Sequence, residues 1–535
     1  MELNEAGLKN KEAWKRLSIE LPVFNREVVI EKTKKEPGWL HFGPGNIFRA
    51  FIASLQQTLL NEGETEFGII AAAPNNSEII DKIYQPHDNL SLLVTMCQDQ
   101  SMRRKVIGSI TEGLVCNPIA VKDWKRLQQI ICASSLQIIS FTITEKGYKL
   151  HDSDGNYLPT VKQDVEAGPK NAKSFPAKLT ALLYERYRAG SLPVTLLSMD
   201  NCSHNGIVLQ KTVLTIGEAW EKASLVENGF AAYLKQKISY PCTMIDKITP
   251  RPADNVQAAL AADGFTDMDF VTSSRGGQYA PFVNAEKTEY LVIEDVFANG
   301  RPPLEKAGVI FTDRSTVDKV ERMKVCTCLN PLHTALAVYG CLLGYTLIAD
   351  EMKNPFLKKL VEKIGCDEGM KVVTNPGVLS PQDFLMECLN ERFPNPAIPD
   401  TPQRIACDTS QKVGVRFGET IKEYVKAPQL DAAKLVYIPL AIAGWCRYLL
   451  GVDDEGNDFA VSPDPLLPQL QEKLMGIRLG EEFSVHQKLQ AILSDSRIFG
   501  SNLYEAGIGT KIEKYFQEMT VEKGAVAATL KKYLS

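Results

Sequence analysis

The feature that most constrains the fold is a short, mostly apolar run that ends in two closely spaced glycines. Residues 39–42 read Trp-Leu-His-Phe, Gly43-Pro44-Gly45 follows, and an amphipathic segment extends from Ile47 to Leu60. This order predicts a buried strand, a tight turn and a helix. Gly43 can adopt the turn, and Gly45 allows a ligand to approach the backbone closely. The first N–H groups of such a helix have no partner inside the helix and can bind a pyrophosphate.

The pattern falls short of a complete dinucleotide fingerprint, because Phe48 stands where a third glycine is expected. By itself, the stretch fits an ordinary strand-to-helix turn equally well. The hypothesis is a dinucleotide site at this turn and at the ends of the strands that follow. Its candidate cofactor-binding residues are Gly43, Gly45, Asn46, Ile47, Phe48, Arg49, Asn75, Thr144 and Glu145.

Further β-prone runs alternate with helical patterns such as residues 177–189. The expected strands are residues 66–73, 91–96, 105–113, 137–144 and 193–199. This alternation predicts a mainly parallel, doubly wound sheet, in which ligands bind beyond the carboxyl ends of the strands. Gly43–Gly45, Thr144–Glu145 and Asp200–Asn201 all fall at such ends, and their convergence strengthens the dinucleotide hypothesis.

Long helical patterns dominate after residue 315, whereas residues 290–297 and 308–311 read as the last strands. The expected helices are 315–329, 332–350, 354–364, 414–426, 429–451, 465–475 and 484–495. The fold class predicted is α/β, with a Rossmann-like doubly wound N-terminal domain and a mainly α-helical C-terminal domain. Residues 1–310 would bind the dinucleotide, and residues 311–535 would form the substrate and catalytic domain.

Charge and composition argue against several classes of partner. The net charge of -5 and the lack of a Lys/Arg tract give no reason to expect nucleic acid. Residues 1–16 lack the apolar core of a signal peptide. The apolar stretches 334–349 and 435–446 are too short to span a membrane and read as buried helices. The twelve cysteines show no zinc-ligand spacing, so reduced thiols in a cytoplasmic protein without a metal site are expected.

The choice between NAD and NADP stays open. NAD-selective folds carry an acidic residue at the end of the second strand, where this chain has Pro74-Asn75-Asn76. No arginine lies beside these residues to bind a 2′-phosphate.

Residues 321–333 combine ionisable and amide side chains in an otherwise apolar context. A lysine such as Lys324 in an apolar cleft gives up its proton more readily, because burial disfavours the ammonium form. It can then accept a hydroxyl proton while hydride leaves the carbon for nicotinamide. Asn330 can donate to the developing alkoxide, and His333, three residues on, can hold a second hydroxyl. The alternatives are a solvated lysine and a histidine satisfied in the core.

Several blocks of the chain occur in the order known from one enzyme family. They are Gly43–Ala50, Thr142–Tyr148, Ser198–Gly206, Met244–Pro250, Ile293–Pro303, Glu321–His333 and Arg404–Lys412. Over roughly residues 39–415, the chain resembles the mannitol dehydrogenase family, the long-chain polyol-specific dehydrogenases that include fructuronate and tagaturonate reductases. The resemblance implies a metal-independent hydride transfer with NAD or NADP.

The resemblance also implies roles for particular residues. Lys324 corresponds to the catalytic lysine, with Glu321 as its proton-relay neighbour, and Asn201 and Asn330 correspond to the pair that holds the reacting oxygen. The remaining implied residues are Asp246 in the active site and His333, Arg404 and Lys412 at the substrate. The step from Arg404 to Lys412 is expected to cover about two helical turns, so that both face one pocket. Two cations suit a hexuronate at least as well as a neutral polyol.

One departure concerns helix geometry. The step from Lys324 to Asn330 is one residue longer than the resemblance implies, and Pro331 follows. On an unbroken helix, one extra residue rotates Lys324 by about 100° relative to Asn330. We therefore predict a local break between Lys324 and Pro331, either a π-bulge or a new helix capped by Asn330.

The leading hypothesis is an oxidoreductase for D-mannonate/D-fructuronate or D-mannitol/D-fructose, acting as a monomer or weak homo-oligomer. A second hypothesis is a nucleotide-binding sensor or scaffold that has lost catalysis. A third, a phosphopolyol dehydrogenase, lacks an identifiable set of extra basic residues.

Overall fold

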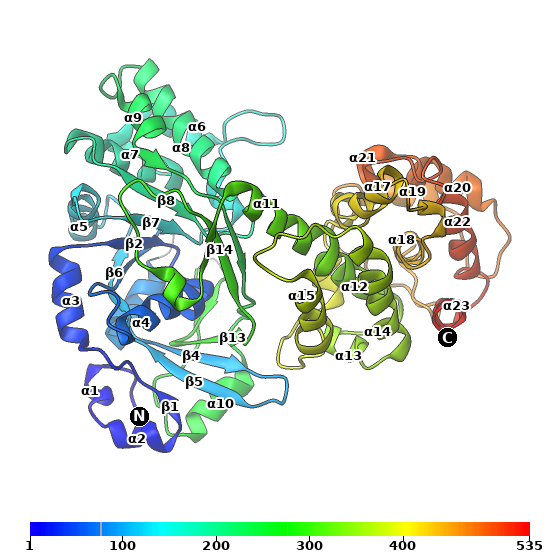
Figure 1. Cartoon of the computed structure of the whole chain (residues 1–535), viewed down its shortest axis with the longest axis horizontal. Coiled ribbons are helices and arrows are strands. Elements are labelled where there is room, and N and C mark those ends of the chain that lie inside the picture. Colours follow the sequence, from blue (N-terminus) through cyan, green and yellow to red (C-terminus); the bar gives the residue numbers. More distant parts are fainter. Residues whose placement is uncertain (75–76, 275) are drawn as a thin grey trace. The chain divides into compact units, whose positions relative to one another are not determined.

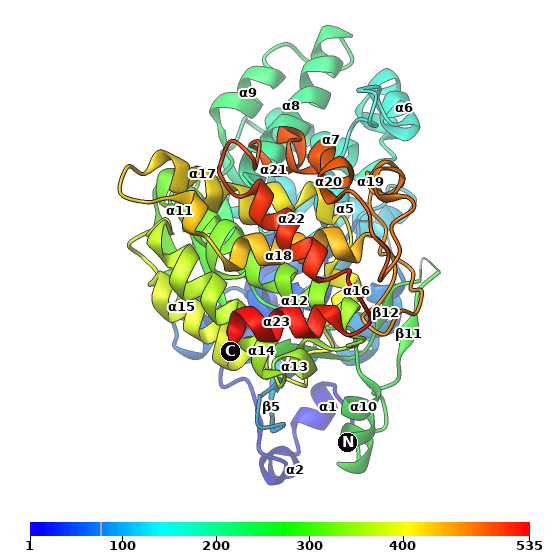
Figure 2. The ribbon, with the colours of Figure 1, turned by 90° about the vertical axis from the view of Figure 1, so that its right-hand side faces the viewer.

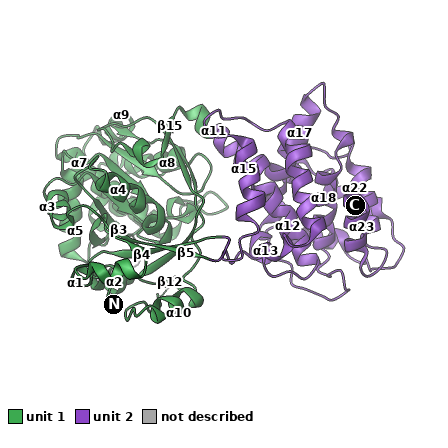
Figure 3. Cartoon of the chain, turned by 60° about the horizontal axis from the view of Figure 1, so that its bottom comes forward, with its two compact units in different colours: residues 1–97, 101–317 green, residues 98–100, 318–535 purple. Residues whose placement is uncertain are grey.

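The structure is a computed structural model that describes residues 1–74, 77–274 and 276–535. The chain divides into two compact units within helix α11 (Arg314–Met323). Unit 1 comprises Met1–Cys97 and Ser101–Val317, and unit 2 comprises Gln98–Gln100 and Asp318–Ser535 (Figure 3).

Unit 1 is built around a six-stranded parallel sheet (Figure 1). Its strands, in spatial order, are β6 (Ile110–Val115), β3 (Ile69–Ala73), β2 (Trp39–Phe42), β7 (Ile138–Phe141), β8 (Val194–Ser198) and β9 (Ile238–Ser239). The first strand of the dinucleotide motif, β2, is central, and the chain order reverses between β2 and β7. This is the doubly wound arrangement expected from the sequence, and the predicted fold class is confirmed.

Successive side chains of the central strands pack into different cores. Leu40 and Phe42 of β2 join a cluster with residues of α5, α7 and α8, whereas Trp39 joins a second cluster on the other face. Both faces of the sheet are therefore covered, which explains why its strands read as continuous apolar runs. The helices of unit 1 are α1 (Glu5–Leu8), α2 (Lys11–Arg16), α3 (Arg26–Lys35), α4 (Ala53–Asn61), α5 (Val121–Cys132), α6 (Pro159–Ala167), α7 (Phe175–Arg188), α8 (Asn205–Lys222), α9 (Phe230–Gln236) and α10 (Asp254–Ala262).

The strand predicted over residues 105–113 is wrong, because the chain turns at Gly108 and contributes two strands. Residues before the turn pair antiparallel with β4, and those after it form β6 beside β3. The four-stranded sheet so formed contains β1 (Ile19–Glu20), β5 (Met102–Ile107), β4 (Ser91–Met96) and β13 (Phe282–Glu286). A smaller sheet contains β10 (Thr243–Asp246), β14 (Tyr290–Glu294) and β15 (Ile310–Thr312), and a hairpin joins β11 (Val271–Thr272) to β12 (Gln278–Tyr279).

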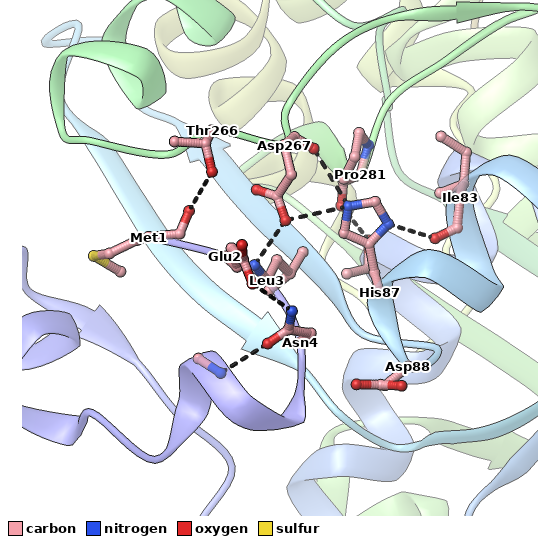
Figure 4. A network of polar contacts seen from close by, with 12 residues as sticks. Met1, Glu2, Leu3, Asn4, Ile83, His87, Asp88, Thr266, Asp267 and Pro281 are labelled. Atoms are coloured by element: carbon pink, nitrogen blue, oxygen red, sulfur yellow. Dashed lines mark hydrogen bonds and ion pairs between the residues drawn. The ribbon is translucent and has the colours of Figure 1, made fainter.

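The N-terminal segment is tied to the loop after α10 (Figure 4). The Asp267 carboxylate accepts a 2.9 Å bond from the Leu3 N–H and lies 3.5 Å from His87 Nε2. Burial opposes the charge on His87, but the hydrogen bonds from its ring to Asp267 and to the Ile83 carbonyl outweigh it and raise the pKa of His87. The first residues are thus part of the fold of unit 1.

Unit 2 is helical (Figure 2). Two almost fully buried helices, α12 and α18, pack against each other, and the Tyr339 hydroxyl donates to the Leu440 carbonyl across them. The Glu368 carboxylate caps α18 by accepting three N–H groups, those of residues 436–438. The helices after α11 are α12 (Asn330–Leu342), α13 (Ile348–Glu351), α14 (Pro355–Glu362), α15 (Pro381–Glu387), α16 (Pro402–Ile405), α17 (Glu419–Lys426), α18 (Tyr437–Tyr448), α19 (Leu467–Leu474), α20 (Val485–Leu493), α21 (Ser496–Phe499), α22 (Gly509–Glu518) and α23 (Ala525–Leu534).

One helical run in the described chain, Arg314–Leu342, is long and apolar enough to cross a membrane by length and composition. However, 83% of its most apolar window is buried inside the fold, as in the core helix of a globular domain.

A fully buried carboxyl group, that of Glu351 at the end of α13, has no hydrogen-bond partner in the described chain. It lies against Gly340 of α12, where an added Cβ would come within 2.1 Å of Glu351 Oε1. Burial raises the pKa of Glu351 well above its ordinary value. The unfolded chain therefore loses this proton at lower pH than the folded chain, and unfolding becomes easier as pH rises above the unfolded value.

Replacing Glu351 by Gln should remove this penalty. The variant should unfold at a higher temperature than the wild type at neutral pH, and the difference should vanish near pH 4, where the carboxyl is protonated in both states. Each unit of pKa elevation is equivalent to about 1.4 kcal/mol. Thermal unfolding across pH tests this, with Asp350→Asn on the exposed side of the same helix as the control. A gain that is independent of pH would contradict the explanation.

Candidate functional site

The turn after β2 has the geometry that the two glycines predict. Gly43 has φ +105°, and a Cβ built there would lie 2.1 Å from the Thr142 carbonyl oxygen at the end of β7. At Gly45, in contrast, an added Cβ would meet no atom within 4 Å. Gly45 therefore borders open space at the start of a helix, which fits the phosphates of a dinucleotide.

A network of buried hydrogen bonds supports this turn. Trp39 Nε1 donates to Ser140 Oγ at 2.7 Å, and Ser140 Oγ lies 2.7 Å from His41 Nδ1. When Ser140 donates to Nδ1, the His41 proton lies on Nε2, which is 2.9 Å from Thr142 Oγ1 and 3.3 Å from the Gly43 carbonyl. Thr142 Oγ1 donates in turn to the Gly43 carbonyl at 2.8 Å. Burial, opposed by the Gly43 carbonyl, lowers the pKa of His41 to about 3, so the ring is neutral.

Two predicted cofactor residues point into the protein. The Phe48 ring is buried and stacks on His41 with a centroid distance of 4.0 Å. The Arg49 guanidinium is 1% exposed; Nη1 donates to the Ala280 carbonyl at 2.7 Å and Nη2 to Asn46 Oδ1 at 3.0 Å. The Arg49 guanidinium is thus enclosed by protein and orients Asn46. The predicted cofactor contact of Arg49 could come only from its backbone and stays a prediction. Backbone contacts from Ile47 and Phe48 stay a prediction.

The ends of β7 and β8 lie beside this turn in the sheet. Phe42, Phe141 and Ser198 are in register, so the segments that follow them meet at one edge. The Asp200 carboxylate joins two of these segments by accepting the Ile143 N–H at 3.1 Å and the Thr144 N–H at 2.8 Å.

This bond network explains the unusual backbone of the β7 loop. Thr144 has φ +65°, and Tyr148 Oη donates to Asp200 at 2.5 Å. Burial raises the pKa of Asp200, against the hydrogen bonds that it accepts. Thr144 and Glu145 are consequently held exposed at the sheet edge, where the sequence placed them. Their contact with the cofactor stays a prediction.

The other predicted residues of unit 1 occupy strand ends. Asn201 is exposed just beyond β8, and Asp246 is the buried last residue of β10. Asn75, predicted to bind the cofactor, lies outside the described residues.

The predicted helix break in unit 2 is confirmed. Residues Lys324–Cys328 form a π-helical turn, and the Leu329 N–H bonds to the Lys324 carbonyl at 3.1 Å. Helix α12 then begins at Asn330, with Pro331 in its first turn. The π-bulge alternative is confirmed, whereas the prediction that Asn330 caps the new helix is wrong, because Leu329 occupies the cap position and Asn330 is the first helical residue. Lys324 is 3% exposed, Glu321 is half-buried three residues earlier, and their catalytic roles stay predictions.

His333, on the first turns of α12, is surrounded by positive charge. Its pKa is lowered to about 3 by burial and by four cations, Arg416, Arg404, Arg392 and Lys412. The Asp400 carboxylate lies 2.9 Å from His333 Nε2 and favours a positive charge on the ring. The same carboxylate also forms an ion pair with Arg404. His333 Nε2 is buried and faces the Asp400 carboxylate.

Arg404 and Lys412 do not lie on one continuous helix, so the expected two-turn spacing is wrong. Arg404 belongs to α16, which ends at Ile405, and a left-handed residue, Asp408, precedes the next turn. Both side chains nevertheless act on His333.

Sequence reasoning missed Asp400, Arg392 and Arg416. Arg416 follows Lys412 by four residues, so helical spacing contained a signal for it. Arg392 and Asp400 come from a separate segment, and no local pattern connects them to His333. Among the described residues, no group of His, Cys, Asp and Glu is arranged to hold a metal ion.

A doubly wound sheet with a glycine turn at its reversal point is the architecture of dinucleotide-binding domains, and here it is joined to a helical unit. Residues 37–306 match the model of the mannitol dehydrogenase Rossmann domain, and residues 316–520 match that of the mannitol dehydrogenase C-terminal domain. The chain belongs to the mannitol dehydrogenase family.

Similar proteins cover the chain almost completely. It is 50% identical to the D-mannonate oxidoreductase of Thermotoga maritima over 99% of each chain, and 28% identical to that of Escherichia coli over 88% of this chain and 91% of the relative. It also matches the structure of Pseudomonas fluorescens mannitol 2-dehydrogenase in a ternary complex with NAD and D-mannitol, with 26% identity, a TM-score of 0.72 and 99% coverage of each chain. The predicted enzyme class, a nicotinamide-dependent oxidoreductase acting on CH–OH groups, is confirmed.

The two glycines of the turn offer a matched test. Gly45→Ala should leave the unfolding temperature unchanged, because its Cβ meets open space, but weaken NADH binding roughly tenfold by crowding the phosphates. Gly43→Ala should instead lower the free energy of unfolding by at least about 2 kcal/mol, because of its positive φ and the Thr142 carbonyl. Calorimetry and NADH fluorescence titration measure both effects. Unchanged NADH affinity in Gly45→Ala would remove the turn from the cofactor site.

Proposed function

We propose that this enzyme interconverts D-mannonate and D-fructuronate with a nicotinamide cofactor, rather than D-mannitol and D-fructose. The observation that carries the proposal is a pair of cations, Arg416 and Lys412, that both act on His333 and have no carboxylate at ion-pair distance in the described part of the chain. A neutral polyol gives such a site no compensation, whereas a sugar acid brings a carboxylate. The relative at 50% identity over the whole chain, a D-mannonate oxidoreductase, supports the same substrate.

The chemistry requires two transfers from one CH–OH group. The bound nicotinamide accepts the hydride, and a protein base accepts the hydroxyl proton. Lys324 is our candidate base, because its side chain is 3% exposed and an amine shielded from water can take up a proton at a fixed place. The π-helical turn displaces Lys324 from the regular spacing, and π-turns often occur where a functional side chain must be aimed.

The remaining roles divide between the units. We infer that unit 1 binds the cofactor at Gly43–Asn46 and at the Thr144–Glu145 loop, and that unit 2 binds the substrate through His333, Arg404 and Lys412. Asn201 and Asn330 are assigned to the reacting oxygen and Asp246 to the active site, with Glu321 as a relay for the Lys324 proton. The division into functional domains at residues 310/311 is part of this proposal.

Lys324→Ala should reduce kcat by about a hundredfold to ten-thousandfold, the contribution of a general base, while NADH affinity changes little. Steady-state kinetics and NADH fluorescence measure the two quantities. Lys319→Ala is the control, because Lys319 is an exposed lysine on the preceding helix. Turnover close to that of the wild type in Lys324→Ala would exclude Lys324 as the base.

The substrate itself is tested with a panel of acids and neutral polyols. The wild type should oxidise D-mannonate with a kcat/KM at least about tenfold above that for D-mannitol, the discrimination that one charge-assisted contact supplies. Equal values, or a preference for D-mannitol, would contradict the assignment. No turnover of any panel member with either cofactor would instead favour the sensor or scaffold alternative.

NADH and NADPH compared in the same assay decide the cofactor preference. We further propose that the enzyme works in the cytoplasm and that it is a monomer or weak homo-oligomer. Light scattering over a concentration series tests the oligomeric state.

A further inference from the structure

Arg416 is a half-buried cation that none of the assigned roles explains. It lies on the π-helical turn Gly414–Gly418, and its Nη1 donates to Thr334 Oγ1 at 2.5 Å. Thr334 follows His333 on α12, and its hydroxyl donates to the Asn330 carbonyl at 2.9 Å. Arg416 is thereby fixed beside the turn of α12 that bears Asn330 and His333.

The guanidinium keeps its charge in this position. Burial lowers the pKa of Arg416 to about 10, which still leaves it protonated at neutral pH. Charges that are shielded from water are normally compensated by an opposite charge. Within the residues that the structure describes, no carboxylate lies at ion-pair distance from Arg416, whereas nearby Arg404 has Asp400.

Neighbouring groups add further positive charge beside Arg416. Arg416 contributes to lowering the pKa of Lys412 after burial itself, and both groups lower the pKa of His333. The Lys412 amine donates to the Cys407 carbonyl, and no carboxylate is at ion-pair distance from it in the described chain. Asp408 and Asp464 act on Lys412 from farther away, and Asp464 is bonded to Ser410.

We infer that Arg416 binds the terminal carboxylate of a six-carbon sugar acid and so determines the preference for the acid over the corresponding neutral polyol. The planar guanidinium can donate two parallel N–H bonds to a carboxylate, whereas a terminal CH₂OH group offers neither the charge nor the second acceptor oxygen. This inference rests on the proposed function, because it assigns the acid selectivity of the same site to one residue.

A purely structural role makes a different prediction. If Arg416 only ties its π-helical turn to α12 through Thr334, removing either partner should impair all substrates alike. If its charge selects the acid, loss of the charge should affect D-mannonate far more than D-mannitol, which differs only in its terminal group.

The experiment compares kcat/KM for D-mannonate and D-mannitol in Arg416→Gln, Arg416→Lys and Thr334→Val. Arg416→Gln should lower the acid-to-polyol ratio at least about tenfold, mainly through the KM for D-mannonate. Arg416→Lys should retain part of the preference, because it keeps the charge but loses the fork. Thr334→Val should leave the ratio unchanged. The matched control is Arg497→Gln, a highly exposed arginine bonded to Asp495.

The outcomes separate this inference from the proposed function. A wild type that prefers D-mannonate, with Arg416→Gln losing activity equally on both substrates, would overturn the inference alone. A wild type that turns over D-mannitol but not D-mannonate would overturn both. If Arg416→Gln does not fold, the ratio in Arg416→Lys decides: an unchanged ratio contradicts the inference, and a several-fold lower one supports it.

Discussion

The close approach of the Gly43 backbone to the end of β7 is the constraint on which unit 1 depends. Parallel strands bring β2 and β7 within hydrogen-bonding distance, and the chain must leave β2 at φ +105° directly against the Thr142 carbonyl. Only glycine can do this without displacing backbone atoms. The buried Trp39–Ser140–His41–Thr142 network fixes the same corner, and the neutral His41 ring makes it possible without a buried charge.

The two units differ in how the charges of their ionisable side chains are compensated. In unit 1, Arg49 and Asp200 are enclosed and bonded to backbone groups, so they give the sheet edge a fixed shape. In unit 2, Arg416 and Lys412 both act on His333 and have no carboxylate at ion-pair distance among the described residues, and such uncompensated charge costs stability. Such an imbalance is tolerated where a ligand supplies the missing charge, since strongly perturbed ionisable groups cluster at functional sites.

The π-helical turn at Lys324–Cys328 shows how a single inserted residue is accommodated. A regular helix would rotate every side chain beyond the insertion by about 100°. The wider turn absorbs the extra residue before α12, so that Asn330 and His333 start a new, regular register. Other π-helical turns occur in the described chain, for example at Phe48–Ile52 and Lys363–Glu368, and one of them, Gly414–Gly418, carries Arg416.

The sequence determined the fold class and the position of the glycine turn, because both follow from local rules: apolar periodicity and the conformational freedom of glycine. The break after Lys324 followed from helical spacing compared with the family pattern that the chain resembles. Parallel strand ends also sufficed to predict that residues near 43, 144 and 200 converge. Only the tertiary structure decided that residues 105–113 divide between two sheets, that the Arg49 side chain turns inward, and that Asp400, Arg392 and Arg416 gather around His333. These outcomes depend on which distant segments pack together, and the burial and charge of a side chain are set by those neighbours rather than by the residues beside it in the chain.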